Sequence, residues 1–263
     1  MDKATLLDRV GATGEERMLL ANLLDRATQA QHRNIPTATE FLTPQEQALA
    51  RDLLAIAHYG QDRYCFFGGY ESAQRCVAVF LPDWMEPEQA MDEANLTCLR
   101  GKHREELTHR DVLGSLMGMG IERERIGDIL IGDGHCDLIV SASLGDYLLQ
   151  SWCSAGREKV TVSQIEFDQL HIPEQKVQIV KDTVMSLRLD AVAASGFSTS
   201  RGKMTTLVQG GKVQVNYKEC AKADKLLQAG DEVSVRGLGK MKLSQIGGLS
   251  KKGRTGIVIE RYL

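Results

Sequence analysis

The sequence is poor in the features that mark metal sites, disulfide frameworks and membrane spans. Its six cysteines are scattered, and no two form the CxxC pair from which zinc and redox sites are commonly built. We therefore expect no metal or other cofactor, and reduced thiols that are mostly buried. The longest charge-free apolar stretch, 112–121, falls short of the roughly 18 residues that a spanning helix needs.

Proline and aromatic residues are also scarce, at 5 prolines and 5% Phe, Trp and Tyr in 263 residues. No biased tract or repeat is present, and 43% hydrophobic with 25% charged residues is typical of globular chains. This length fits two or three small domains better than one. The start, MDKATLLDRV, carries acidic residues where a signal peptide has a basic region, so we expect a cytoplasmic protein without a membrane partner.

Charge of opposite sign collects in the two parts of the chain. Residues 181–263 hold 15 Lys and Arg against 7 Asp and Glu, a balance of +8. Residues 1–180 hold 17 basic and 28 acidic residues, a balance of −11. Such asymmetry indicates an acidic body joined to a basic terminal domain that meets a polyanion.

The pattern of residues 1–82 predicts an α-rich domain closed by a hairpin. Leucines at helical spacing favour a helix over 14–31. Thr43, Pro44 and Glu46 form the start signal of a second helix, with a capping box. The β-rich runs 64–67 and 76–81 flank a Gly-Gly turn and indicate two strands.

Residues 83–172 are expected to form a ferredoxin-like domain, because their signals follow the order βαββαβ. Strands are predicted at 96–100, 128–131, 136–141 and 160–167, with helices over 110–119 and 144–152. Many RNA-binding modules share this fold but stack bases on strand aromatics, and the strands DILI and CDLIVS have none. If this domain contacts RNA, we expect basic loop residues to do so, namely Arg100, Lys102, His103 and Arg104.

The segment 173–182 is interpreted as a linker, and residues 183–263 as a basic domain of two helices, 187–195 and 199–209, and following strands. The second helix begins beside Ser200 and presents Arg201 and Lys203 in its first turn. An anion there meets free N–H groups, the positive helix end and cations together. Further basic residues extend the positive surface: Lys212, Lys218, Arg236, Lys240 and Lys242. The whole chain is therefore expected to be of the α+β class.

Four ordered elements of this domain resemble the S4 RNA-binding domain. The matching positions are Arg188, Leu189 and Asp190; Ser200 and Arg201; Gly211, Val213, Val215 and Asn216; and Gly230, Asp231 and Val233. Met204 and Tyr217 depart from the usual alanine and glycine. The resemblance implies an L-shaped surface that recognises structured RNA, with Arg188, Ser200, Arg201, Lys203, Lys212 and Asn216 contacting or shaping the site. Asp190 is expected to orient Arg188.

The whole chain resembles the YlmH family, through FLTPQEQ at 41–47, the stretch 107–129 and the terminal domain. This resemblance implies a ribosome-associated RNA-binding protein related to factors that act on stalled large subunits still holding peptidyl-tRNA, and we expect it to be non-enzymatic. Its expected partner is therefore ribosomal RNA of the large subunit. Whether tRNA is also bound, what the acidic domains recognise and the oligomeric state stay open.

Three other patterns favour different functions and are given less weight. The stretch 248–255 imitates a phosphate-binding P-loop, but a strand is expected after it instead of a helix. Asp133, His135 and Asp137 alternate along a predicted hairpin, an arrangement that can hold a metal ion. No further metal ligand is identifiable beside them. S4 domains also accompany RNA-modifying enzymes, namely pseudouridine synthases and rRNA methyltransferases, and this alternative stays open although no catalytic motif of either is found. A cell-division scaffold is a further alternative.

Overall fold

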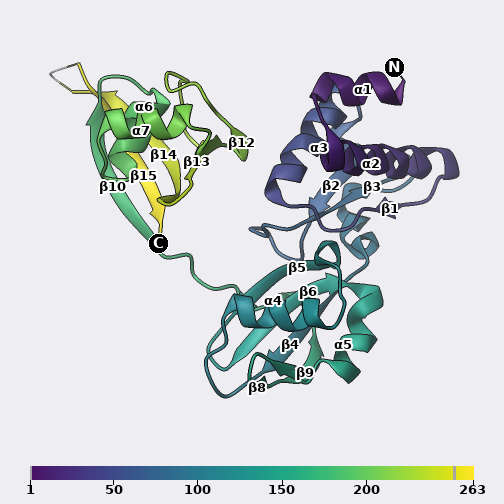
Figure 1. Ribbon diagram of the computed structural model, residues 1–263. Helices are drawn as coiled ribbons and strands as arrows, with labels where there is room; N and C mark the ends of the chain where they lie inside the picture. The colour runs from purple at the N-terminus through teal and green to yellow at the C-terminus, as the bar shows by residue number, and fades with distance from the viewer. Residues whose placement is uncertain (1, 251–252) are drawn as a thin grey trace. The chain divides into compact units, whose positions relative to one another are not determined.

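The computed structural model describes residues 2–250 and 253–263. The chain divides into two compact units, Met1–Pro173 and Glu174–Leu263. Figure 1 labels most of the helices and strands of the two units. No helix among the described residues is long and apolar enough to cross a membrane.

The first part of unit 1 packs three helices against a small antiparallel sheet of order β1-β3-β2 (Figure 1). The capping box expected at the start of the third helix is confirmed, with Glu46 accepting from the Thr43 N–H at 2.6 Å. The hairpin is confirmed as well, since β2 and β3 pair in antiparallel register. The elements are α1 (Lys3–Val10), α2 (Gly14–Arg33), β1 (Thr37–Ala38), α3 (Pro44–Ile56), the 3-10 turn Gln61–Arg63, β2 (Tyr64–Phe67), β3 (Val77–Phe80) and the 3-10 helix Pro87–Ala94.

The second part of unit 1 has the ferredoxin-like fold that the sequence predicts. Its antiparallel sheet has the order β5-β6-β4-β9, and two helices cover one face (Figure 1). A two-stranded hairpin, β7–β8, precedes the last strand and was not expected. The elements are β4 (Leu96–Lys102), α4 (His109–Gly118), β5 (Ile126–Ile131), β6 (His135–Ser141), α5 (Gly145–Ser151), β7 (Ser154–Ala155), β8 (Glu158–Lys159) and β9 (Thr161–Ile165), with 3-10 turns at Arg123–Arg125, Ala142–Leu144 and Phe167–Gln169.

A shared core joins the two parts of unit 1. The sheet face opposite the helices buries Cys98 and Ile139 against Phe41, Val79 and Leu81 of the first part. Because the two parts share this core, they form one compact unit without a boundary at residue 82. The independence of 1–82 and 83–172 as domains stays a prediction.

Unit 2 packs two helices on one face of a six-stranded antiparallel sheet of order β10-β15-β14-β13-β11-β12 (Figure 1). Helix α6 lies so close to β14 that a Cβ at Gly196 would overlap the sulfur of Met241. The elements are β10 (Val177–Val184), α6 (Leu189–Gly196), α7 (Arg201–Gln209), β11 (Val213–Val215), β12 (Lys218–Glu219), β13 (Glu232–Val235), β14 (Gly239–Leu249) and β15 (Thr255–Tyr262).

The segment interpreted as a linker is mostly a strand, which corrects that expectation. Residues 177–184 form β10 and pair with β15 along their whole length. Val180 and Val184 face the core of unit 2, but Val177 and Ile179 on the other face are exposed, so the segment lacks the alternation of apolar and polar residues that predicts a strand.

The P-loop-like stretch 248–255 joins β14 and β15, and the strand expected after it is confirmed as β15. Two of its residues, 251 and 252, lie outside the described residues.

Candidate nucleic-acid interface

Two arginines of unit 2 share one buried carboxylate. Asp190, in the first turn of α6, is 2% exposed. Arg188 donates from Nε and Nη2 to the two carboxylate oxygens, at 3.2 Å each, and Arg201 donates from Nε to Oδ2 at 3.0 Å. We call these three residues the arginine clamp. The expected pairing of Asp190 with Arg188 is confirmed, whereas the bond to Arg201 was not expected.

The clamp carries a net positive charge. Burial of Asp190 opposes its ionisation, but the hydrogen bonds and charges of both arginines outweigh burial and lower the pKa of this carboxyl. The hydrogen bonds that Arg188 donates to Asp190 in turn raise the pKa of Arg188. One carboxylate therefore orients two guanidinium groups whose side chains stay 37% and 56% exposed. Both retain N–H groups suited to bidentate contact with phosphate.

The segment 223–227 lies against the start of α6 and accepts hydrogen bonds from its first backbone N–H groups. The carbonyls of Ala223 and Lys225 accept from the N–H groups of Asp190 and Leu189, at 3.0 and 2.8 Å. Arg188 forms an isolated bridge with Leu226, and the preceding residue, Lys225, has an exposed side chain. Lys225 was not among the expected site residues. The signal that could have identified Lys225 was the group of basic residues between Asn216 and Gly230, which belong to the third and fourth elements of the S4 pattern.

The start of α7 adds backbone donors and a cation to the same region. Ser200 caps the helix, because its Oγ accepts from the N–H of Lys203 at 3.2 Å. The N–H groups of Arg201 and Gly202 have no hydrogen-bond acceptor among the residues that the structure describes. Lys203 is exposed and makes no ion pair with any residue that the structure describes. Ser200 therefore shapes the site, and Lys203 is available to an anion.

Lys212 and Arg236 lie together at one end of the sheet. The N–H of Arg236 donates to the carbonyl of Lys212 at 2.9 Å, across the ends of β11 and β13. Both side chains are exposed, and neither has an ion-pair partner in the part of the chain that is described. These two residues remain candidates for RNA contact.

Asn216 has a role within the fold. With Tyr217 it forms the two-residue turn between β11 and β12, and both residues have positive φ, 50° and 65°, as a type I′ turn requires. Its amide donates to Asp231 Oδ1 at 2.8 Å and accepts from the Glu232 N–H at 2.9 Å. The side chain thus fixes the hairpin, and the expectation that Asn216 shapes the site is favoured over direct contact.

Lys240 lies on the sheet face opposite the helices. Met241 and Leu243 of the same strand are buried in the core with α6 and α7. Because successive side chains of a strand point to opposite faces, Lys240 points away from the helices. Its ammonium binds Glu232 at 2.8 Å and the Tyr217 hydroxyl at 2.9 Å. The structure therefore places Lys240 apart from the clamp, with its charge compensated. Lys218 is exposed and begins β12 opposite Val215.

The alternating Asp133, His135 and Asp137 do not form a metal site. Asp137 is fully buried and accepts two hydrogen bonds from Arg100, at 2.7 and 2.6 Å. His135 packs against the ring of His171. No group of three potential metal ligands is found among the described residues. Arg100 belongs to β4 and is committed to Asp137, so it is not the free loop cation that was expected.

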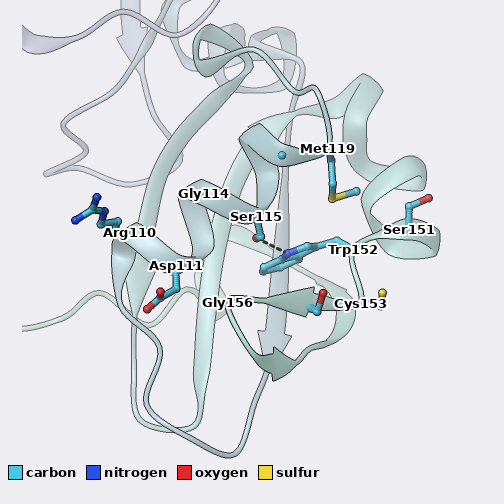
Figure 2. A pocket seen from close by; sticks show the side chains of 11 residues that line it. Arg110, Asp111, Gly114, Ser115, Met119, Ser151, Trp152, Cys153 and Gly156 are labelled. Carbon is cyan, nitrogen blue, oxygen red and sulfur yellow. Dashed lines mark hydrogen bonds between the residues drawn. The ribbon is translucent and has the colours of Figure 1, made fainter.

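A hollow of about 590 Å³ between α4 and the segment after α5 carries no catalytic pair (Figure 2). The Ser115 hydroxyl donates to the Val112 carbonyl and accepts from the Trp152 indole N–H at 3.0 Å. Cys153 lines the same hollow, and no histidine is among its lining residues. The one carboxylate among the lining residues, Asp111, accepts hydrogen bonds from Thr108, and no bond from it to Ser115 or Cys153 is found among the described residues.

Two family models match the chain. The model described as "Putative RNA-binding domain in YlmH" matches residues 96–169, which form the ferredoxin-like part of unit 1. The S4 domain model matches residues 187–233, which include the clamp and both helices of unit 2.

Known proteins resemble the chain over most of its length. "Ribosome-associated protein quality control protein P2" of Bacillus subtilis (strain 168) is 36% identical over 250 residues, covering 94% of this chain and 95% of that protein. The solved structure of "Cell division protein ylmH from Streptococcus pneumoniae" has a TM-score of 0.53 at 18% identity, covering 62% of this chain and 97% of that one, and shows similarity of fold alone. The extent of the Bacillus match and the two domain matches agree with each other, and the chain therefore belongs to the YlmH family, with an S4 RNA-binding domain at its C-terminal end.

Proposed function

We propose that the protein docks unit 2 on ribosomal RNA of the large subunit, at or near a bound peptidyl-tRNA. In this proposal it acts in ribosome-associated quality control, in the cytoplasm and without catalysis. The Bacillus relative is named for ribosome association and quality control, and both matched families are RNA-binding domains. These names support a ribosomal RNA partner.

The observation that carries the proposal is the arginine clamp. A buried carboxylate that holds two exposed guanidinium groups reduces the side-chain entropy lost when these groups bind phosphate. The first turn of α7 adds Lys203 and backbone N–H groups, which favour an anion at the positive end of the helix dipole.

Recognition in this account rests on phosphate neutralisation and on the shape of the RNA. Two arginines and a lysine at fixed positions suit a folded backbone more than a base sequence. Phosphate contacts release counterions, so affinity for the subunit falls steeply as salt rises. Lys212, Lys218 and Arg236 extend the positive surface in this proposal.

The proposal is tested by co-sedimentation of the protein with isolated small subunits, vacant large subunits and large subunits that carry peptidyl-tRNA. We expect salt-sensitive binding to large subunits, tighter when peptidyl-tRNA is present, and little binding to small subunits. Equal binding to vacant and loaded large subunits would show that peptidyl-tRNA does not contribute to the binding of this protein. Binding to neither subunit contradicts the proposal as a whole.

A further inference from the structure

Both faces of the sheet in the ferredoxin-like part are largely covered, which leaves little of it for the stacking of RNA bases. Helices α4 and α5 cover one face, with Leu99 and Leu138 buried beneath them. The first part of the chain covers the other, where RNA-binding modules of this fold stack bases. Phe41 approaches β5 so closely that a Cβ at Gly127 would lie 2.6 Å from its ring. An RNA that contacts this part must therefore bind elsewhere.

A basic hollow of about 560 Å³ lies at one end of this sheet. One side is the end of β4 and the following loop, and the other is the turn of the β7–β8 hairpin with the start of β9. Lys102 pairs in register with Thr161, which brings the two sides together. We call this hollow the basic pocket, lined by Lys102, His103, Arg104, Arg157, Glu158, Lys159 and Thr161.

The basic pocket concentrates the positive charge of an acidic region. Residues 96–169 contain 8 Lys and Arg against 12 Asp and Glu, and four of these eight cations line the pocket. Among the others, Arg100 is paired with Asp137, Arg123 donates to backbone carbonyls and Arg125 donates to the Ser143 hydroxyl. Arg110 is the one exposed cation of these residues away from the pocket. Positive potential that an RNA can reach in this part is therefore focused at the pocket.

The cations of the pocket are exposed and lack internal partners. Lys102, Arg104, Arg157 and Lys159 are all exposed, and none forms an ion pair with another described residue. Glu158 is the one carboxylate among the lining residues, so it offsets one of four charges.

His103 also lines the pocket and is 9% exposed. Its Nδ1 lies 2.7 Å from the Glu105 carbonyl, which can only accept, so Nδ1 donates. Its buried Nε2 has no partner among the described residues. The lining of the pocket thus combines exposed cations with one buried, unsatisfied polar atom.

We propose that the basic pocket binds phosphates of an RNA backbone, as a second RNA contact of this chain beside the arginine clamp. Four exposed cations and a single carboxylate suit a polyanion, and the absence of aromatic residues from the lining suits backbone contact more than base readout. This site does not depend on ribosome binding by unit 2, since different residues of a different unit form it.

The test measures binding of a fluorescein-labelled RNA hairpin to the full chain by fluorescence anisotropy, across a salt series. The background carries Arg188→Ala and Arg201→Ala, so that the clamp does not mask the pocket. The pocket variant adds Arg104→Gln and Arg157→Gln, one from each side of the hollow. The matched control adds Arg9→Gln and Arg33→Gln, which removes equal charge from exposed helix ends of the same unit.

We expect the pocket variant to bind roughly tenfold more weakly than the control variant near physiological salt. The slope of log affinity against log salt should also decrease by about 1.5, as two lost phosphate contacts predict. Equal affinity of the two variants, or no RNA binding by the background protein, overturns the proposal. Circular dichroism verifies that each variant is folded.

Discussion

The Nε of Arg201 donates to Oδ2 of Asp190 at 3.0 Å, and this bond connects the start of α7 to the first turn of α6. Arg188 bonds to the same carboxylate. The positions of both guanidinium groups therefore depend on one buried residue that does not itself need to contact RNA.

Replacing Asp190 with Asn should destabilise unit 2 and weaken RNA binding together. Loss of the charge-assisted bonds should lower the free energy of unfolding by about 1–3 kcal/mol at neutral pH. Chemical denaturation of both proteins measures this difference, and equal stability would show that the clamp contributes nothing to the fold.

The effect of Asp190→Asn should depend on pH in a defined direction. The pKa of Asp190 is lowered from its ordinary value of 3.8, so its stabilising contribution is fully present above that value. The contribution is lost as pH falls through the lowered pKa. The stability difference between wild type and variant should thus be constant from about pH 5 to 8 and shrink in stronger acid. A difference that grows in acid would contradict this assignment.

Ser200→Ala should cost stability through the helix cap. The variant loses the hydrogen bond to the Lys203 N–H, which is worth about 1 kcal/mol at an N-cap. Thermal unfolding measures the loss, and Ser200→Asp, which can also cap, should restore stability. Because Asp adds negative charge at the site, it should weaken RNA binding more than Ala does.

Lys203 and Lys240 should respond in opposite ways to removal of their charge. Lys203→Ala should weaken RNA binding and reduce the salt slope by about 0.7–0.9 with little change in stability. Lys240→Met should cost about 1 kcal/mol of stability, since Glu232 loses its partner, and should leave the salt slope unchanged. RNA anisotropy titrations with denaturation curves separate the two effects, and a reduced salt slope for Lys240→Met would place Lys240 in the interface.

Cys153 should be the fast-reacting thiol of the native protein. Burial raises the pKa of Cys76 to about 11 and those of Cys98 and Cys136 to about 12, so these side chains are almost entirely thiols near neutral pH. Cys153 is exposed. Titration with a thiol reagent should show a fast phase that Cys153→Ser removes. Cys65 is half-buried and the other four cysteines are buried, so a fast phase that persists in this variant would contradict the prediction.

Local signals predicted most of the elements, because capping and periodicity are properties of adjacent residues. Thr43 and Ser200 begin helices where the sequence indicates, and the order of strands and helices in residues 96–165 gave the ferredoxin-like fold. The β10 strand was missed, because its pairing with β15 joins segments far apart in the sequence.

The candidate site was predicted in part for the same reason. The S4 pattern selects Arg188 and Arg201, but their common bond to Asp190 depends on how α6 and α7 pack. Lys240 looked like a free cation because its partner Glu232 lies on a neighbouring strand. The basic pocket depends on the β7–β8 hairpin, which the sequence did not predict.

The most direct test of the central claim measures co-sedimentation with large ribosomal subunits for an Arg188→Ala/Arg201→Ala variant. The control is Lys176→Ala/Lys181→Ala, which removes equal charge from unit 2, with Lys181 on the sheet face away from the helices. The account predicts that the arginine variant loses most of its binding, with a smaller salt dependence, while the control binds as wild type does. Equal binding by both variants would contradict it.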